Sequence, residues 1–427
     1  MNQDARAPFV LAGVCSVWRQ LTLNIASLWS YLGFPESRQS LAELELRVSR
    51  GKGAPVDVFF HPGSYEPDGD SVHCLALLHA IAGRWRNVDI DYSDALENTS
   101  FAWLTECPTP FLQSLCLASN STEWHSGHVL SLHGVLPHAP RLRRFFFDDV
   151  AKKWTFHSHT ATNITTVSIW TYQWSARTLC AFLRQVAETI TTLTLIGNDR
   201  RGHRPHDFIP ADAVVLLPNL IRLTLHSPRW LVHISVPNLH QLEFSVRDLE
   251  PSLEPLLEYL SGIKTLVLWD DLATTEPRCV QALKRIFVNL THLKFALPPD
   301  LYAVYGHEAF GEHCAVPDSF LRTLVSADSA PQVWPNLQQM SFGNDADPLP
   351  QRIDIDMEIL TELVRRRNDL YGGALPLLQL HVAPAAKLHV LPEEVEHIMR
   401  LLRRAGPSCR GHALSDSQSL YSRMNCL

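Results

Sequence analysis

A short apolar motif, L-x-x-L-x-L, recurs along most of the sequence and limits what the chain can fold into. Its clearest copy lies in LPNLIRLTLHS at residues 217–227, where Leu223 and Leu225 alternate as they do on one face of a strand. Eleven copies are found when any apolar residue may replace leucine. They start at Trp85, Leu112, Leu142, Ile164, Ile190, Leu220, Leu239, Ile263, Leu290, Leu337 and Leu377. Each copy predicts a strand.

The spacing of the copies indicates a repeat architecture. The first nine starts lie 19 to 30 residues apart, close to the leucine-rich-repeat period, and the last two gaps are 47 and 40 residues long. Helical spacing of Leu75 and Leu78, and of Leu179 and Leu183, predicts helices between strands, with Ser175 capping the second helix. A single unit buries too little surface to fold alone, so the units must stack. We therefore expect an α/β fold, an irregular leucine-rich-repeat solenoid with a parallel concave sheet.

Composition and charge narrow the possible partners and compartments. The 427 residues carry a net charge of −7, which gives no reason to expect binding to nucleic acid or to a membrane. No apolar run approaches the length of a membrane span. The nine cysteines are odd in number and form no C-x-x-C pair, a pattern typical of reduced thiols in the cytoplasm or nucleus.

The N-terminal segment carries its own apolar pattern. Val14, Val17, Trp18 and Leu21 have helical spacing and predict one amphipathic helix. A second apolar cluster, Leu28, Trp29 and Leu32, follows before Pro35. On residue types alone, this segment is interpreted as a helical cap over the end of the repeats. After it, Val56, Val58 and Phe60 predict a strand.

Six residues of this segment resemble part of a known signature. They are Val14, Cys15, Trp18, Arg19, Leu28 and Trp29, and they resemble the V-C-x-x-W-R…P-x-L-W second half of the F-box in fungal F-box-like proteins. The segments GRWRNVDI (83–90), LPHAPRLRRFFFDDV (136–150) and LCAFLRQVAETITTLTL (179–195) are similar to later parts of the same family. The resemblance implies a substrate receptor of a cullin-RING ubiquitin ligase, in which these six residues bind the ligase adaptor. Only Met1 to Val10 occupy the place of the first half, so we expect a truncated box.

The sequence contains no common catalytic motif. It lacks G-x-S-x-G, Walker A, G-x-G-x-x-G, H-E-x-x-H and EF-hand patterns, so we expect no enzyme activity and no cofactor. His307, Glu308, His313 and Cys314 lie close together, but their spacing does not match common zinc sites. They are interpreted as incidental loop residues, with a metal site as the alternative.

A second candidate surface follows the strands. The aromatic residues just past the strand cores, with nearby charged residues, form a predicted partner-binding surface. Its members are Trp170, Tyr172, Trp174, Arg222, Arg229, Trp230, Trp269 and Asp270. The alternative for the aromatic residues is core or edge packing. Acidic residues after the strands, Asp148, Asp149, Asp270 and Asp271, could select a basic partner or could be solvated strand ends.

These patterns predict three regions. Residues 1–60 form the truncated F-box-like helical segment and a linker strand, and residues 61–406 form the degenerate repeats with a capping helix from Pro392 to Gly406. Residues 407–427 form a disordered tail. The expected function is a protein-interaction module that holds an unknown protein substrate for the ligase. A repeat scaffold without adaptor binding and an enzyme with an unrecognised site are the alternatives.

Overall fold

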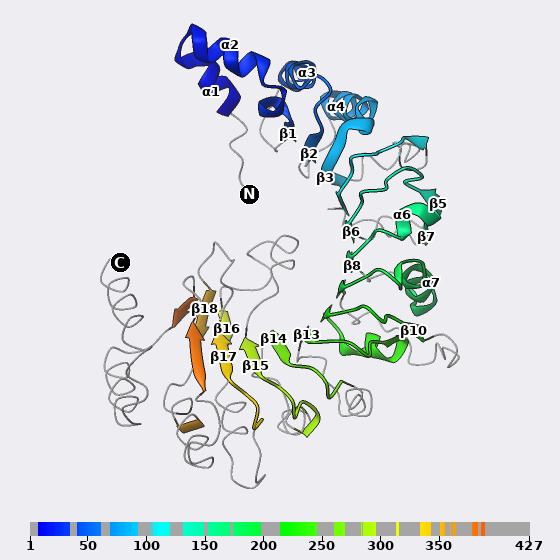
Figure 1. Ribbon diagram of the computed structural model, residues 1–427, viewed down its shortest axis with the longest axis vertical. Helices are drawn as coiled ribbons and strands as arrows, with labels where there is room; N and C mark the ends of the chain where they lie inside the picture. The colour runs from blue at the N-terminus through cyan, green and yellow to red at the C-terminus, as the bar shows by residue number, and fades with distance from the viewer. Residues whose placement is uncertain are drawn as a thin grey trace. The chain divides into compact units, whose positions relative to one another are not determined.

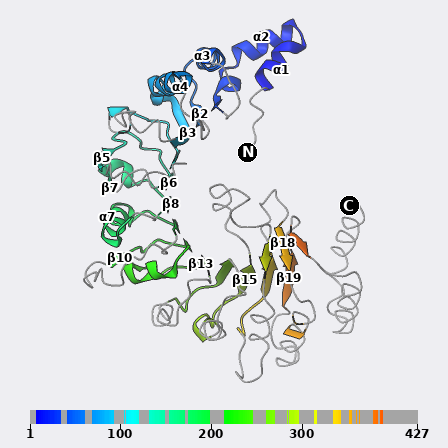
Figure 2. The same ribbon diagram turned by 180° about the vertical axis from the view of Figure 1, so that it is seen from behind.

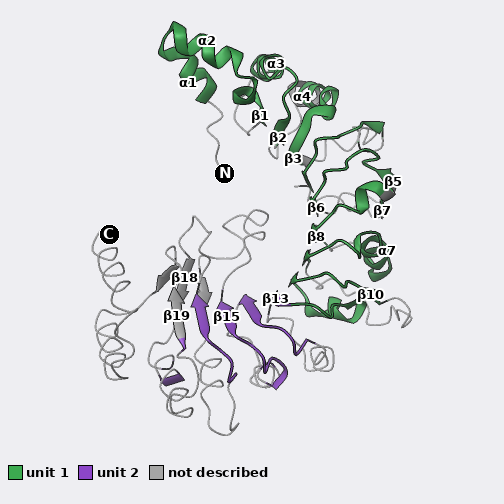
Figure 3. Cartoon of the chain, viewed as in Figure 1, with its two compact units in different colours: residues 1–239 green, residues 240–427 purple. Residues whose placement is uncertain are grey.

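The fold is mixed α/β and divides into two compact units. The computed structural model describes residues 7–34, 41–60, 69–92, 104, 106–119, 131–148, 153–170, 174–197, 214–245, 260–269, 283, 285–295, 313–315, 334–342, 351–354, 359, 362–363, 378–382 and 386–388. Unit 1 is Met1–Leu239 and unit 2 is His240–Leu427 (Figure 3). The predicted capping helix after Pro392 and the predicted tail lie outside the described residues.

Unit 1 alternates short helices with parallel strands. Its described helices are α1 (Ala7–Val14), α2 (Ser16–Asn24), η1 (Ala26–Trp29), α3 (Leu41–Arg50), α4 (Gly69–Ala80), η2 (Ala82–Arg84), α6 (Ser158–Ala161), α7 (Ala176–Val186) and η7 (Pro228–His233). The strands of its main sheet are β1 (Tyr31–Phe34), β2 (Val56–Phe60), β3 (Trp85–Tyr92), β4 (Ser114–Ser119), β6 (Arg144–Asp148), β8 (Thr166–Trp170), β9 (Thr192–Ile196) and β11 (Arg222–Leu225). Two further parallel pairs are β5 (Ser131–Val135) with β7 (Lys153–Phe156), and β10 (Val215–Leu216) with β12 (Ile234–Ser235).

The main sheet is open, and its strands keep one register through the copies of the repeated motif. Among the described residues of unit 1, its strands pair in parallel, and the two apolar positions of one copy align with those of the next. The first of these positions is occupied by Leu115, Phe145, Val167, Leu193 and Leu223, all buried. Each of the eleven copies of the motif contains a strand of the parallel sheet, so the strand prediction is confirmed.

The helices of unit 1 cover one face of this sheet. In both views α3, α4 and α7 lie on the same side of the strands (Figures 1 and 2). The α7 helix begins as predicted, since the Ser175 hydroxyl accepts a hydrogen bond from the Thr178 amide at 3.1 Å. Its buried side packs toward the sheet, with the Phe182 ring 6.2 Å from the Phe145 ring of β6. Residues next to these core positions in a strand must point to the opposite face.

Asparagine side chains link successive copies of the motif by hydrogen bonds. The Asn219 amide donates to the Glu188 carbonyl at 2.7 Å, and the Asn238 amide donates to the Pro218 carbonyl at 2.8 Å. Each donor directly precedes the first apolar residue of its copy, and each acceptor lies two residues before that of an earlier copy. Asn289 repeats this relation in unit 2, donating to the Ser261 carbonyl at 3.0 Å. These bonds satisfy turn carbonyls that a parallel strand stack leaves exposed.

Unit 2 contains the remaining copies of the motif, each with a strand. Its main strands pair in parallel in the order β13 (Gln241–Ser245), β14 (Thr265–Trp269), β15 (His292–Phe295), β17 (Gln339–Phe342) and β19 (Gln379–Val382). A separate parallel sheet contains β16 (His313–Ala315), β18 (Gln351–Asp354) and β20 (Ala386–Leu388). The stacked rings of Phe295 and Phe342, 5.4 Å apart, show that the apolar positions remain in register here.

The N-terminal segment differs from the prediction in one helix and contains one strand that was not predicted. The expected single helix is interrupted at Cys15, whose extended backbone (φ −161°, ψ 175°) separates α1 from α2. Residues 31–34 form β1, a strand that pairs with β2 and was not predicted. Its short YLGF sequence carries Gly33 and directly follows an apolar helical cluster, so periodicity alone gives no strand signal. The strand predicted at Val56, Val58 and Phe60 is confirmed as β2.

His79 of α4 gives unit 1 a pH-dependent stability. Burial beside Trp85 of β3, whose ring lies 6.2 Å away, lowers the pKa of His79 from 6.5 to about 4. Between these values the unfolded chain binds a proton that the folded chain does not. The free energy of unfolding should therefore be highest above pH 6.5 and fall by roughly 2 kcal/mol as the pH drops towards 4, after a discount for partial exposure. Urea unfolding at pH 7.5 and 5.0 measures this loss. The His79→Phe variant should lose part of the difference, and an unchanged pH dependence would contradict the assignment.

Candidate protein-binding surfaces

Helices α1 and α2 expose an unusual number of apolar side chains. The exposed residues in and directly after these helices are Val10, Val14, Val17, Trp18, Leu21 and Ile25, each 45 to 64 % accessible. The order expected for a buried amphipathic helix is inverted in α2, because Thr22 is buried while Val17, Trp18 and Leu21 are exposed. Several exposed apolar side chains within one short segment are typical of a binding surface in a folded protein. We call these six residues the N-terminal apolar surface.

The six signature residues separate into an exposed group and an internal group. The exposed group is Val14 on α1, Cys15 between the two helices, and Trp18 and Arg19 on α2. Arg19 also donates from Nε to the Ala12 carbonyl at 3.1 Å, which satisfies a carbonyl in the last turn of α1. Leu28 is half-buried, and Trp29 is buried at 2 % exposure. Contact of Trp29 with the adaptor stays a prediction, and its burial indicates a packing role in the folded chain.

Trp29 is instead an anchor that holds the helical segment together. Its indole Nε1 donates to the Thr22 carbonyl at 2.9 Å, and the Phe9 ring of α1 meets it edge-on at 5.3 Å. One tryptophan thus binds α2 through a hydrogen bond and α1 through a ring contact. This packing presents the apolar residues of both helices outward.

A buried ion pair fixes α3 beside this anchor. The Arg47 side chain is fully buried, and its guanidinium donates to Glu43 Oε1 from Nη2 at 2.7 Å and from Nε at 3.1 Å. It also donates from Nη1 to the Tyr31 carbonyl of β1 at 3.2 Å and lies 4.9 Å from the centre of the Phe9 ring. The same cation therefore contacts α3, β1 and α1. Its burial is tolerated because its charge is paired and its donors are used.

The sheet of unit 1 also exposes part of the face opposite its helices. Five residues on β1, β2, β3, β4 and β6 are half-exposed there and alternate with buried core residues. They are Tyr31, Phe59, Asp89, Cys116 and Phe146. Farther along the same register, Ser168, Thr194 and Thr224 are buried. Nearer the strand starts, Thr166, Thr192 and Arg222 of the same face are half-exposed. We call the five half-exposed residues on β1 to β6 the open face.

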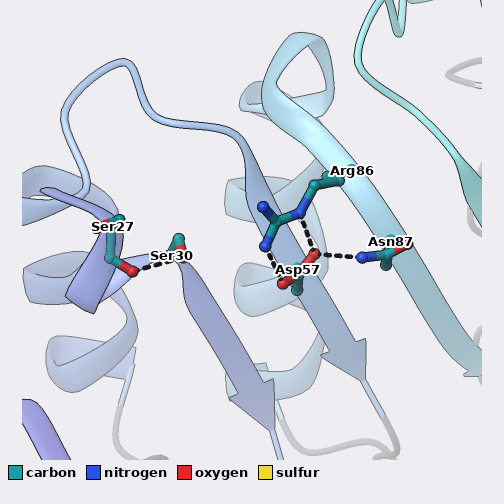
Figure 4. A network of polar contacts seen from close by, with 5 residues as sticks. All are labelled: Ser27, Ser30, Asp57, Arg86 and Asn87. Carbon is teal, nitrogen blue, oxygen red and sulfur yellow. Dashed lines mark hydrogen bonds and ion pairs between the residues drawn. The ribbon is translucent and has the colours of Figure 1, made fainter. Parts of the chain in front are cut away.

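A polar network borders the open face between β2 and β3. The carboxylate of Asp57 accepts from Arg86 Nε at 2.9 Å and from the Asn87 amide at 2.7 Å, as Figure 4 shows. Its hydrogen bond with Asp57 raises the pKa of Arg86. In the same view Ser30 donates from its hydroxyl to the Ser27 carbonyl, just before β1. Asp57 is thus neutralised by neighbours on β3 and links two strands.

The pKa of Tyr31 reflects the charges near the β1 end of the open face. Its ring stacks on Phe59 with centroids 5.0 Å apart. Burial raises the pKa of the Tyr31 phenol, Arg47 opposes that shift, and the charges of Asp57 and Asp89 add to it. An aromatic pair therefore lies within the field of two carboxylates.

The predicted surface past the strand cores is only partly exposed. Trp174 is 1 % exposed and packs edge-on against Phe182 of α7, with ring centroids 5.6 Å apart. Trp170 and Trp269 are buried as well. For these three residues burial favours the packing alternative, and partner binding by them stays a prediction. Apolar area gained in the interior outweighs solvent exposure when a strand end meets a helix.

The remaining members of that predicted surface are distributed as follows. Arg229 is exposed, and Arg222 and Trp230 are half-buried. Tyr172 and Asp270 lie outside the described residues, as do Asp149 and Asp271, and only the strand position of Asp148 is described. Partner binding by Arg222, Arg229 and Trp230 stays a prediction.

The described residues contain no cluster suited to a metal. Within the ranges given above, no group of three or more histidine, cysteine, aspartate or glutamate side chains is close enough to hold an ion. Of the HEAFGEHC stretch only the backbone of His313 and Cys314, in β16, is described. Among the same described residues, no helix has the length and apolar character needed to cross a bilayer.

Sequence reasoning missed the open face. Its residues occupy the variable positions between the recurring leucines, for example Cys116 between Leu115 and Leu117. The alternation of the strands could have predicted which positions face outward. It could not have predicted that Cys116 and Phe146 stay half-exposed while Ser168, Thr194 and Thr224, farther along the same register, are buried.

No protein-family description matches the sequence. No curated protein matches it either.

Proposed function

We propose that this chain is a non-enzymatic protein-interaction protein, the substrate receptor of a cullin-RING ubiquitin ligase. In this proposal α1 and α2 bind the ligase adaptor, and the sheet holds a protein substrate. The observation that carries the proposal is the N-terminal apolar surface. It shares Val14 and Trp18 with the residues that resemble the second half of an F-box, and exposed apolar side chains of this kind are typical of a surface that a partner covers.

The proposed architecture is a degenerate leucine-rich-repeat solenoid. Eleven copies of the motif form strands, their apolar positions are in register, and asparagine side chains bridge neighbouring copies. Such arrays present large surfaces built from variable strand positions, which suits recognition of another protein. These features support the proposal without defining the substrate.

A scaffold that binds no adaptor is the second candidate. One observation favours it, because Trp29 is buried and Leu28 half-buried, so a third of the resembling signature serves packing and not docking. The two candidates differ in a single property, which is affinity of α1 and α2 for the ligase adaptor.

The adaptor-binding experiment uses Trp18 as its probe. The purified chain should bind immobilised adaptor in biolayer interferometry, and Trp18→Ala should weaken that binding by about thirtyfold, because tryptophan at an interface centre is a typical hot spot. Trp230→Ala is the matched control, since Trp230 is a half-buried tryptophan far along the same unit, in η7. It should leave adaptor binding unchanged. No binding by the unaltered chain at micromolar concentrations would favour the scaffold.

A further inference from the structure

One row of the open face combines two aromatic side chains with a carboxylate. Hydrogen-bond register places Phe59 of β2 next to Asp89 of β3, Asp89 next to Cys116 of β4, and Cys116 next to Phe146 of β6. All four side chains are half-exposed. We call them the Phe59–Phe146 row. The row is continuous because each residue is the direct neighbour of the next on a parallel strand.

The sizes of these side chains favour an elongated occupant. Neighbouring strands are about 4.8 Å apart, so the two phenylalanines stand roughly 14 Å from each other along the row. Between them are two shorter side chains, one of which carries a negative charge. A lysine or arginine lying over Asp89 would contact a phenyl ring with its aliphatic stem or its cation and reach the carboxylate with its charged end.

The charges around the row favour a basic group at Asp89. Asp57, the nearest carboxylate along β2, is bound by Arg86 and Asn87. Arg47 is buried against Glu43 on the other side of Tyr31. Arg144 is exposed at the far end, two residues before Phe146, and would favour an acidic neighbour of the bound residue. Arg144 thus lies near the Phe146 end of the row, and the Asp89 carboxylate lies between the two phenylalanines.

We infer that the Phe59–Phe146 row binds a lysine or arginine side chain of the partner protein. Asp89 pairs with the cation, and the two phenylalanines pack against its stem. The inference rests on the proposed role of the sheet as the substrate-binding surface, and it names the class of substrate residue that this surface selects.

Peptide pools test this preference directly. The probes are fluorescent pools of about nine residues with random flanks and one fixed central residue, which is lysine, arginine, acetyl-lysine, citrulline or glutamate. With the full chain, fluorescence anisotropy should give the lysine and arginine pools about tenfold lower apparent Kd than their neutral counterparts, as a half-exposed ion pair plus one cation–π contact would produce. In Asp89→Asn the ratio should fall below about twofold. In Asp89→Glu, which keeps the charge, it should persist.

Matched variants separate the row from the general negative charge of the chain. Glu45→Gln removes one exposed charge from α3 and should leave the preference intact. Phe59→Leu and Phe146→Leu should each reduce it by about threefold, and Arg144→Gln should preserve or increase it. Circular dichroism checks that each variant is folded.

Two results would overturn the inference. One is equal affinity of the unaltered chain for basic and neutral pools, including the absence of binding to any pool. The other is an unchanged basic preference in folded Asp89→Asn. Adaptor binding is measured on α1 and α2, so the ligase proposal can fail while the basic preference holds, and the reverse.

Discussion

Replacing Glu43 by leucine is expected to destabilise the N-terminal part of unit 1 by about 3 kcal/mol, because it leaves the Arg47 guanidinium buried without its main counter-charge. Arg47 is fully buried, and its guanidinium donates two hydrogen bonds to the Glu43 carboxylate, at 2.7 and 3.1 Å. Glu43 is itself partly exposed, which keeps the expected cost at the lower end of the range for broken buried pairs. Hydrogen exchange of the α3 and β1 amides in the full chain measures the local free energy of opening.

Two variants show whether charge burial is the cause. Glu45→Leu changes an exposed acid on the same helix and should alter the local free energy by less than about 0.5 kcal/mol. Adding Arg47→Met to Glu43→Leu removes the stranded charge and should recover most of the loss, because well-packed apolar residues can replace a buried pair at little cost. If the double variant is less stable than Glu43→Leu alone, the Arg47 contacts with Tyr31 and Phe9 outweigh its charge.

The sequence predicted the strands well and the N-terminal segment poorly, for one physical reason. Leu223 and Leu225 follow strict alternation and are buried by identical positions in neighbouring copies, so local pattern and tertiary packing agree. In α2 the two disagree. Val17, Trp18 and Leu21 have the spacing of a buried stripe, yet they are exposed. Periodicity identifies a helix face but not what covers it.

The candidate surfaces divide in the same way. Trp18 and Trp174 both carry a sequence-based prediction of partner contact, Trp18 from the F-box resemblance and Trp174 from its place past a predicted strand. Packing separates them, because Trp174 meets Phe182 of α7 while nothing in unit 1 buries Trp18 to a similar extent. Asp89 could not have been singled out, because its position matters only through the register that places it between Phe59 and Cys116.

Replacing Trp29 by alanine is expected to cost about 3 to 5 kcal/mol, as is usual for a large buried aromatic residue. The change removes the edge-on contact with Phe9 and the hydrogen bond to the Thr22 carbonyl, and these are the contacts that join α1, α2 and η1. Hydrogen exchange should therefore show loss of protection throughout residues 7–29 of the full chain, with little change at β8 and β9.

Trp18→Ala is the matched comparison, and it separates docking from packing within one signature. Trp18 is 47 % exposed, so its removal should change the local free energy by less than about 0.5 kcal/mol. It should nevertheless weaken adaptor binding strongly if α1 and α2 form the docking surface. Trp29→Ala should weaken adaptor binding only in proportion to the unfolding of α1 and α2. Equal loss of stability in the two variants would mean that Trp18 belongs to the packed interior, and the N-terminal apolar surface would then lose its largest member.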